Sequence, residues 1–354
     1  MSKHGGNIVA VAKELGCRVV DLIDMSSNLT PLGMAPGLRQ VLEQGLSQIA
    51  YLPETESETL RNIFAARFGL AENEVLVGNG TTEFIFALPW AFTGRRAVIV
   101  NPTYSDYQLA CSWAGVEVVD FMLDRDRDFQ LDLHRLSSQL RGGELVFLCN
   151  PNNPTGVLTP NRELHDFIVN HPQTFFLVDE SYLPFTRDIS QLTLELPGNL
   201  FVLFSSSKIY GIPGLRLGFL VSRAANLKKL GERRKPWGVN RIAQLAGEFL
   251  LTHGEVYAEQ VRAFLEKERP WFVDRLAKIP GIEVIPGNAN FILIRLHGQM
   301  TARQLRDKML VRRIMIRNCD NFEGLDDTFF RICLKERKEN EACIRALSDI
   351  VAER

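Results

Sequence analysis

The sequence predicts an α/β protein with a mostly parallel sheet between helices, followed by a smaller α+β domain. From residue 74 onward, short apolar segments alternate with amphipathic stretches, and this order is typical of strands and helices in a parallel sheet. After about residue 240, a long helical region leads into further short apolar segments. A chain of 354 residues is long enough to form one large domain and a smaller one.

Short apolar runs bounded by glycine, proline or polar residues are expected to form the buried strands of the large domain. In chain order these segments are EVLVGNG (74–80), AVIVNPTY (97–104), VEVVDFML (116–123), ELVFLCNPNNPTG (144–156), FFLVDESY (175–182), LFVLFSSSK (200–208) and LRLGFLVS (215–222). Helical patterns such as 81–92 and 161–171 lie between them. In the second part, 241–279 is expected to be helical, and 282–296, 313–318 and 329–335 are expected to contain strands before a terminal helix.

The composition excludes several classes of function. The formal net charge is -1, which gives no overall basic surface for nucleic acid and no general attraction to an acidic membrane. The six cysteines are scattered without a CxxC spacing, so we expect free thiols in a reducing cytoplasm and neither a disulfide framework nor a metal site. The longest apolar run, FIFALPWAF, is about half as long as a bilayer-spanning helix. We therefore expect a soluble, cytoplasmic protein.

Residues that suit a phosphate or a planar ligand follow the first strands. Gly80, Thr81 and Thr82 stand between a strand and a helix, where backbone N–H groups and hydroxyls can bind an anion. An ordinary glycine turn with threonine caps explains this segment equally well when it is considered alone. Tyr104 follows the next strand and can stack on a ring or simply pack, and Asn153 lies in a proline turn.

Two later strands end in charged residues, although buried strands are usually apolar. Asp179 follows four apolar residues and needs a partner there, and Tyr182 comes three residues later. A carboxylate that caps the next turn is the alternative interpretation. Lys208 ends the segment LFVLFSSSK, and a lysine is almost never fully buried without a partner.

Together these residues match the needs of pyridoxal 5′-phosphate. This cofactor requires a lysine that can form an imine, a carboxylate that keeps the ring nitrogen protonated and an aromatic side chain that stacks on the ring. Lys208, Asp179 and Tyr104 supply these three groups. Hydroxyls and a guanidinium that suit the phosphate come from Ser205, Ser207 and Arg216. Each residue alone has an ordinary explanation, but their joint occurrence at successive strand ends favours the cofactor.

The order of these motifs resembles that of the fold-type I pyridoxal-phosphate enzymes in the class I/II aminotransferase group. The resemblance rests on GNGTTE, NPTYSDY, NPNNPTG, VDESY, SSSK and PGLRLGF, and it runs from His4 to about Arg331. It implies a large domain at 35–245 with a mostly parallel seven-stranded sheet sandwiched by helices. It also implies a small domain formed by 1–34 and 246–354. Histidinol-phosphate aminotransferases and the threonine-phosphate decarboxylases of cobalamin biosynthesis are the most similar branches.

The resemblance also implies roles for single residues. Lys208 is expected to hold the cofactor covalently, Asp179 to pair with the ring nitrogen and Tyr104 to stack on the ring. Asn153 and Tyr182 are expected to face the phenolic oxygen of the ring. The residues expected around the phosphate are Gly80, Thr81, Thr82, Ser205, Ser207 and Arg216.

Two further positions concern subunit assembly and the branch of the family to which the chain is similar. Tyr51 matches a tyrosine that reaches the phosphate of the neighbouring subunit's cofactor, which implies a homodimer with shared active sites. Ser181 stands where many members of the group have alanine. This difference removes no chemical group that the cofactor requires.

The expected substrate residues come from both ends of the chain. Arg317 and Arg331 lie fourteen positions apart on adjacent predicted strands and can clamp a substrate that carries a carboxylate and a phosphate; surface ion pairing is the alternative. The segment HGGNI resembles the opening of the threonine-phosphate decarboxylases. The residues that the resemblance places at the substrate are His4, Gly5, Asn28, Asn153, Arg317 and Arg331.

The resemblance therefore implies decarboxylation of O-phospho-L-threonine to (R)-1-aminopropan-2-yl phosphate and carbon dioxide in cobalamin biosynthesis. The runner-up is transamination of histidinol phosphate with 2-oxoglutarate, because the same lysine and aspartate serve both reactions. A more remote alternative is a regulatory ligand-binding module with an aminotransferase-like fold. That arrangement needs a separate DNA-binding domain, and the strand-helix pattern begins too early to leave room for one.

Overall fold

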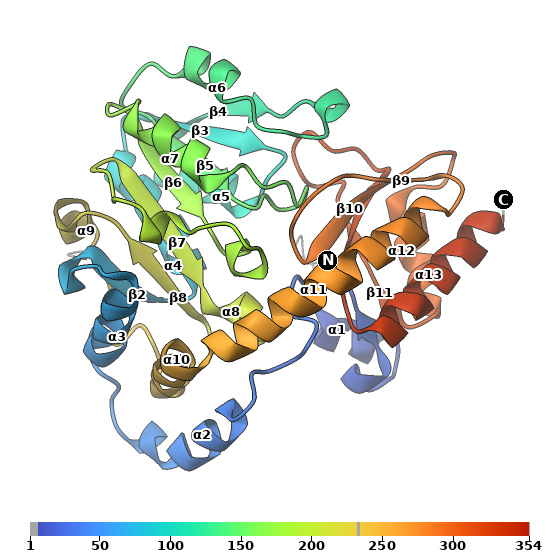
Figure 1. The fold of residues 1–354 in the computed structure, drawn as a ribbon, viewed down its shortest axis with the longest axis horizontal. Helices are drawn as coiled ribbons and strands as arrows, with labels where there is room; N and C mark the ends of the chain where they lie inside the picture. Colours follow the sequence, from blue (N-terminus) through green and yellow to red (C-terminus); the bar gives the residue numbers. More distant parts are fainter. Residues whose placement is uncertain (1–5, 232–233, 354) are drawn as a thin grey trace.

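The computed structural model describes residues 6–231 and 234–353, and its main sheet carries the residues of interest (Figure 1). The strands of this sheet lie in the order β2-β8-β7-β6-β5-β3-β4. β8 runs antiparallel to β2 and β7, and the other neighbours are parallel. The strands are β2 (Val75–Asn79), β3 (Arg96–Asn101), β4 (Glu117–Met122), β5 (Leu145–Cys149), β6 (Phe175–Asp179), β7 (Leu200–Ser205) and β8 (Leu217–Val221). The predicted mostly parallel seven-stranded sheet is confirmed.

Helices cover both faces of this sheet, because alternate strand residues point to opposite sides. In β6, Phe176 and Val178 join an apolar cluster with α3, α6, α7 and α10, whereas Leu177 joins a cluster with α4, α5 and α9. The helices of this part are α2 (Leu38–Gly45), α3 (Glu58–Phe68), α4 (Thr81–Ala87), α5 (Asp106–Ala114), α6 (Leu133–Gln139), α7 (Asn161–Val169), α8 (Ser206–Ile209), α9 (Ala224–Gly231) and α10 (Arg241–His253).

A second unit combines the start and the end of the chain. Its four-stranded antiparallel sheet has the order β12-β13-β10-β9, and a short parallel pair joins β1 to β11. The long helix α11 extends from the main sheet to this unit (Figure 1). The elements are α1 (Ile8–Glu14), β1 (Ile23–Asp24), α11 (Glu255–Ala277), β9 (Ile282–Val284), β10 (Phe291–Leu296), α12 (Ala302–Val311), β11 (Ile314–Met315), β12 (Arg317–Asn318), β13 (Phe329–Cys333) and α13 (Arg337–Ala352).

The helical region expected at 241–279 is divided near Gly254 into α10 and α11. The domain boundary predicted at 245/246 falls inside α10, so the division into 35–245 and the remainder stays a prediction. Short 3-10 helices connect the larger elements: η1 (Val19–Asp21), η2 (Leu46–Ala50), η3 (Glu72–Glu74), η4 (Leu88–Phe92), η5 (Arg125–Arg127), η6 (Leu183–Phe185) and η7 (Gln191–Thr193).

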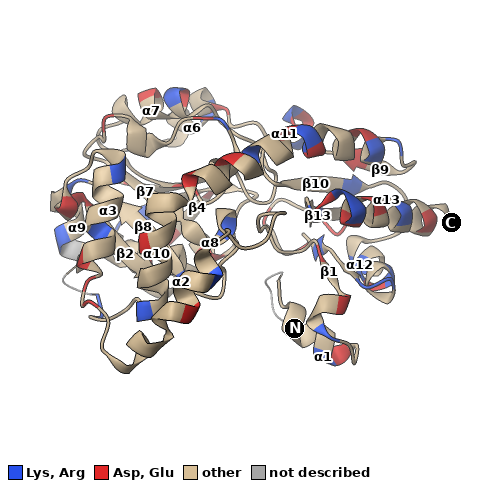
Figure 2. Cartoon of the chain, turned by 60° about the horizontal axis from the view of Figure 1, so that its bottom comes forward, with Lys and Arg blue, Asp and Glu red and all other residues tan. Residues whose placement is uncertain are grey.

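Acidic and basic residues are interspersed on the outer helices, for example on α11 and α13 (Figure 2). On α11, Glu259 and Glu266 form ion pairs with Arg187, which lies in the loop after η6. Within the described residues, no helix combines the length and the apolar character that crossing a membrane requires.

Candidate active site

A cavity of about 170 Å³ lies at the carboxyl ends of β5, β6 and β7. In parallel sheets, ligands bind beyond this edge because loops and helix starts converge there. The cavity contains a lysine and a carboxylate, and an aromatic wall and several hydroxyls surround them. The lining residues are Thr81, Thr82, Ile85, Tyr104, Tyr107, Cys149, Asn153, Asp179, Ser181, Tyr182, Ser205, Ser207, Lys208 and Arg216.

Lys208 lies in α8, the short helix that follows β7 directly. Burial lowers the pKa of its amine to about 8, and the guanidinium groups of Arg331 and Arg216 act in the same direction, whereas Asp179 raises it. The amine therefore loses its proton near pH 8, more than two pH units below an exposed lysine, and its neutral form can act as a nucleophile.

Asp179 ends β6, and the surrounding protein holds its carboxylate through three donors. Its Oδ1 accepts hydrogen bonds from the backbone N–H of Ser181 at 2.9 Å and from the Ser181 hydroxyl at 2.5 Å. Its Oδ2 accepts one from the phenol of Tyr107 at 2.8 Å. Burial raises the pKa of Asp179, while these hydrogen bonds and the charge of Lys208 oppose that shift.

Tyr104 forms part of the aromatic wall and is tethered by its own segment. Its phenol donates to Oδ2 of Asp106 at 2.7 Å, and its ring meets the ring of Tyr107 edge-on at a centroid distance of 5.7 Å. Asp106 and Tyr107 form the start of α5, so this helix positions the residues that follow β3.

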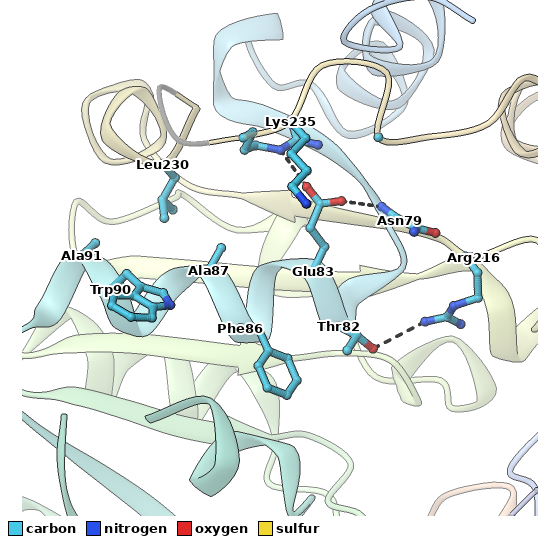
Figure 3. Close-up of a pocket in the computed structure, with 12 residues that line it drawn as sticks. Asn79, Thr82, Glu83, Phe86, Ala87, Trp90, Ala91, Arg216, Leu230 and Lys235 are labelled. Carbon is cyan, nitrogen blue, oxygen red and sulfur yellow. Dashed lines mark hydrogen bonds and ion pairs between the residues drawn. The ribbon is translucent and has the colours of Figure 1, made fainter. Parts of the chain in front are cut away.

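The hydroxyl-rich end of the cavity depends on a close approach between β8 and the start of α4. Arg216 donates to the hydroxyl of Thr82 at 3.4 Å (Figure 3). Gly80 has a φ of +75°, and a Cβ there would lie 2.5 Å from Nη2 of Arg216. A Cβ on Gly218 would lie 2.5 Å from the backbone nitrogen of Thr81. Both glycines are thus required for this packing.

A second cavity, of about 330 Å³, shares Lys208, Tyr104, Asn153 and Tyr182 with the first one. Its cationic wall consists of Arg317 and Arg331, which are direct partners in the β12–β13 ladder. Further lining residues are Gly6, Ile8, Asp24, Ser26, Ser27, Asn28, Leu29, Ser105, Pro213 and Phe322.

The two arginines of this cavity are held differently. Arg331 is buried, donates to Oδ1 of Asn153 and donates to the carbonyl of Ser26 at 3.0 Å. Its Nε is buried without a hydrogen-bond partner in the described part of the chain. Arg317 donates at 2.7 Å both to the carbonyl of Asn318 and to Oδ1 of Asn321.

The segment after β1 forms the remaining wall of the second cavity. Asp24 accepts hydrogen bonds from the hydroxyls of Ser26 and Ser27 at 2.7 and 2.5 Å. The Ser26 hydroxyl oxygen also accepts from the backbone N–H of Gly6 at 3.1 Å. The amide of Asn28 donates to the phenol of Tyr182 at 3.2 Å, which links the two cavities.

The structure brings together nearly all of the residues that the sequence singles out. Tyr51 is the exception: it follows η2, is 74% exposed and lines neither cavity of its own chain. His4 and Gly5 lie outside the described residues. The sequence reasoning missed the contacts of Tyr107 and Ser181 with Asp179, although both residues lie inside the quoted motifs NPTYSDY and VDESY.

The first cavity fits pyridoxal 5′-phosphate. Hydroxyls and Arg216 supply donors for a phosphate, Asp179 supplies an acceptor for a ring nitrogen, and Lys208 lies in the same cavity. Tyr104 adds an aromatic wall. A planar cationic ring with a phosphate arm requires this combination of groups.

Fold and site together define a lysine-dependent cofactor enzyme of the α/β class, and the comparison with known proteins defines its family. Residues 20–347 match the family described as aminotransferase class I and II. The chain belongs to this family. Pyridoxal 5′-phosphate is the cofactor of this family, as the sequence predicts.

Several relatives cover nearly the whole chain. Threonine-phosphate decarboxylase of Salmonella typhimurium is 33% identical over 99% of this chain and 97% of that protein. Histidinol-phosphate aminotransferase of Moorella thermoacetica is 30% identical over 98% of this chain and 90% of that protein. The crystal structure of L-threonine-O-3-phosphate decarboxylase from Porphyromonas gingivalis has a TM-score of 0.85 and 31% identity, covering 94% of this chain and 100% of that one.

A longer relative is matched in part. The chain is 29% identical to, and spans 41% of, the adenosylcobalamin biosynthesis bifunctional protein CobDQ of Leptospira interrogans. The predicted resemblance to threonine-phosphate decarboxylases within the superfamily is confirmed.

Proposed function

We propose that this chain decarboxylates O-phospho-L-threonine to (R)-1-aminopropan-2-yl phosphate and carbon dioxide in cobalamin biosynthesis. The observation that carries this proposal is the pair of arginines, Arg317 and Arg331, in the cavity that also reaches Lys208. The similarity to the Salmonella and Porphyromonas decarboxylases and to the Leptospira cobalamin protein supports it.

Two guanidinium groups in one small cavity suit a substrate that carries two anionic groups. O-phospho-L-threonine carries a carboxylate and a phosphate and satisfies both at once. Histidinol phosphate carries one anionic group, so the second candidate would offer two anionic groups only through its other substrate, 2-oxoglutarate. Arg331 uses two of its five N–H groups on Asn153 and Ser26, so donors remain for a substrate carboxylate.

The residues of the first cavity would hold the cofactor. Lys208 would bind it covalently and Asp179 would keep its ring nitrogen protonated. Tyr104 would stack on the ring, and Asn153 and Tyr182 would bond its phenolic oxygen. The phosphate would lie among Gly80, Thr81, Thr82, Ser205, Ser207 and Arg216.

When bound, the cofactor accepts electrons from a bond to the substrate Cα that stands perpendicular to its ring. The protein decides which bond takes this position. Arg331 would orient the substrate carboxylate so that the bond between Cα and the carboxylate carbon breaks and carbon dioxide is released. The ammonium form of Lys208, which predominates at neutral pH because the pKa of the amine is about 8, would then return a proton to Cα.

Histidinol-phosphate transamination remains the second candidate function. The Moorella relative, which is 30% identical, supports it, and Lys208 and Asp179 would serve that reaction equally well. The two candidates differ in their need for a keto acid. The decarboxylase consumes phosphothreonine alone, whereas the aminotransferase stops after one turnover without 2-oxoglutarate.

A substrate comparison tests the proposal. Purified protein with cofactor should turn over O-phospho-L-threonine many times without a keto acid, and Lys208→Ala should abolish both turnover and the borohydride-sensitive absorbance band. Keto-acid-dependent turnover of histidinol phosphate alone would favour the second candidate. A protein that binds no cofactor would refute both.

We further propose a cytoplasmic homodimer that shares its active sites. A groove of about 1150 Å³ runs beside Thr82 and Arg216, and its apolar wall contains Phe86 and Trp90 (Figure 3). A partner subunit that covers this groove would bring its own exposed Tyr51 toward the phosphate end of the cavity.

A further inference from the structure

The carboxylate of Asp179 accepts three hydrogen bonds from the protein itself. The backbone N–H and the hydroxyl of Ser181 both donate to Oδ1. The phenol of Tyr107 donates to Oδ2. A carboxylate offers about four acceptor sites, two on each oxygen. Ser181 therefore fills both sites of Oδ1, and Tyr107 fills one site of Oδ2.

We propose that Ser181 and Tyr107 are positioning residues that leave one acceptor site, on Oδ2 of Asp179, for the ring nitrogen of the cofactor. This inference rests on the proposed role of Asp179. It assigns a function to the serine that stands where many members of the group have alanine, and to a tyrosine of the NPTYSDY motif that the cofactor itself does not require.

The packing around Tyr107 holds its phenol in place. Tyr107 is 1% exposed, and its ring stacks on that of Phe147 at a centroid distance of 5.2 Å. It lies in the first turn of α5, next to Asp106, which tethers the phenol of Tyr104. One helix start therefore fixes both the aromatic wall and the carboxylate. A donor held in this way keeps a reacting geometry without reorganisation.

The two donors also determine whether the proton between Asp179 and the ring nitrogen of the cofactor resides on the nitrogen or on the carboxylate. Hydrogen bonds to a carboxylate stabilise its charged form, so Ser181 and Tyr107 disfavour a protonated Asp179. With them in place, the proton stays on the ring nitrogen and Asp179 stays anionic. Without one of them, the carboxylate becomes more basic, and the proton moves from the ring nitrogen toward Asp179.

The test is ¹⁵N NMR of the holoenzyme reconstituted with pyridoxal 5′-phosphate labelled at the ring nitrogen. In the wild type the signal should lie at the protonated position. In Ser181→Ala and in Tyr107→Phe it should move toward the unprotonated position, with the ratio of the two forms changed about tenfold for each lost hydrogen bond. The dissociation constant of the cofactor should rise by a similar factor. Ser181→Thr, which keeps the hydroxyl, should restore the wild-type signal.

Matched controls remove hydroxyls of other buried serine and tyrosine residues. Ser222→Ala deletes a hydroxyl that donates to the carbonyl of Leu200, at the end of β7 opposite to the cavity. Tyr257→Phe deletes a phenol that donates to the carbonyl of Gly33. Both should leave the ¹⁵N signal unchanged. If the ¹⁵N signal stays at the wild-type position in both Ser181→Ala and Tyr107→Phe, the inference is wrong, while the proposed function is unaffected. A wild-type protein that binds no cofactor would refute the proposed function itself.

Discussion

At the residue scale, the protonation of Lys208 determines when the site can react. Burial and two guanidinium groups lower the pKa of this amine to about 8, so its neutral fraction rises as the pH increases toward that value. We predict that capture of pyridoxal phosphate by the apoprotein accelerates about tenfold per pH unit below pH 8 and levels off above it. Stopped-flow absorbance measures this rate. A midpoint near 10, the value of an exposed lysine, would contradict the account.

The guanidinium of Arg331 is the second residue whose chemistry can be tested alone. It donates to Asn153 and to the carbonyl of Ser26, and an ammonium lacks the planar fork that makes both contacts. We predict that Arg331→Lys lowers kcat/KM for phosphothreonine about 100-fold. Steady-state kinetics measure the effect, and Arg345→Lys on the exposed face of α13 is the matched control. If Arg331→Lys changes kcat/KM by less than about twofold, Arg331 does not bind the substrate.

At the scale of elements, strand ends were predictable because the signal is local. An apolar run that stops at Asp179 or Lys208 marks both the strand and the polar group beyond its end. The contacts of Tyr107 with Asp179 were not predictable in this way. They join α5 to β6 across seventy-two positions, and sequence periodicity carries no information about such packing.

The turn after β1 shows the same limit. Ser26 and Ser27 line the second cavity because Asp24 accepts hydrogen bonds from both hydroxyls and β1 pairs with β11 from the other end of the chain. Short segments of two paired residues leave too weak a pattern for prediction. Arg331, in contrast, lies in the apolar segment of β13, and the family resemblance indicated Arg317 as its neighbour at the substrate.

The contact between β8 and the start of α4 gives a prediction at this scale. A methyl group at Gly218 would lie 2.5 Å from the backbone nitrogen of Thr81, so the strand and the helix start must separate. We predict that Gly218→Ala lowers the free energy of unfolding by about 1–3 kcal/mol and weakens cofactor binding. Gly214→Ala is the control, because a Cβ there meets nothing within 4 Å. Thermal unfolding and cofactor titration measure both effects; equal behaviour of the two variants would contradict the predicted clash.

At the scale of the whole molecule, the sequence predicted the main sheet and the family, and it placed Tyr51 at a subunit contact. The monomer alone does not test that placement, since Tyr51 is exposed. The groove beside Thr82 and Arg216 could not be predicted, because it depends on how α4, η4 and α9 pack together.

Subunit complementation tests the shared site. Lys208→Ala and Tyr51→Ala should each have low activity as homodimers. When the two variants are coexpressed, hybrid dimers contain one site with both native residues, so about a quarter of the wild-type activity should return on random pairing. Activity assays on mixed and unmixed preparations measure this. A mixture no more active than its parts would show that Tyr51 does not act across subunits.

The most direct test of the proposed reaction follows labelled atoms of the substrate. O-phospho-L-threonine carrying ¹³C in the carboxylate and ¹⁵N in the amine is incubated with the holoenzyme and 2-oxoglutarate. The account predicts that ¹³C leaves as carbon dioxide while ¹⁵N remains in 1-aminopropan-2-yl phosphate. Transfer of ¹⁵N to glutamate, with ¹³C retained in the oxo acid, would contradict it.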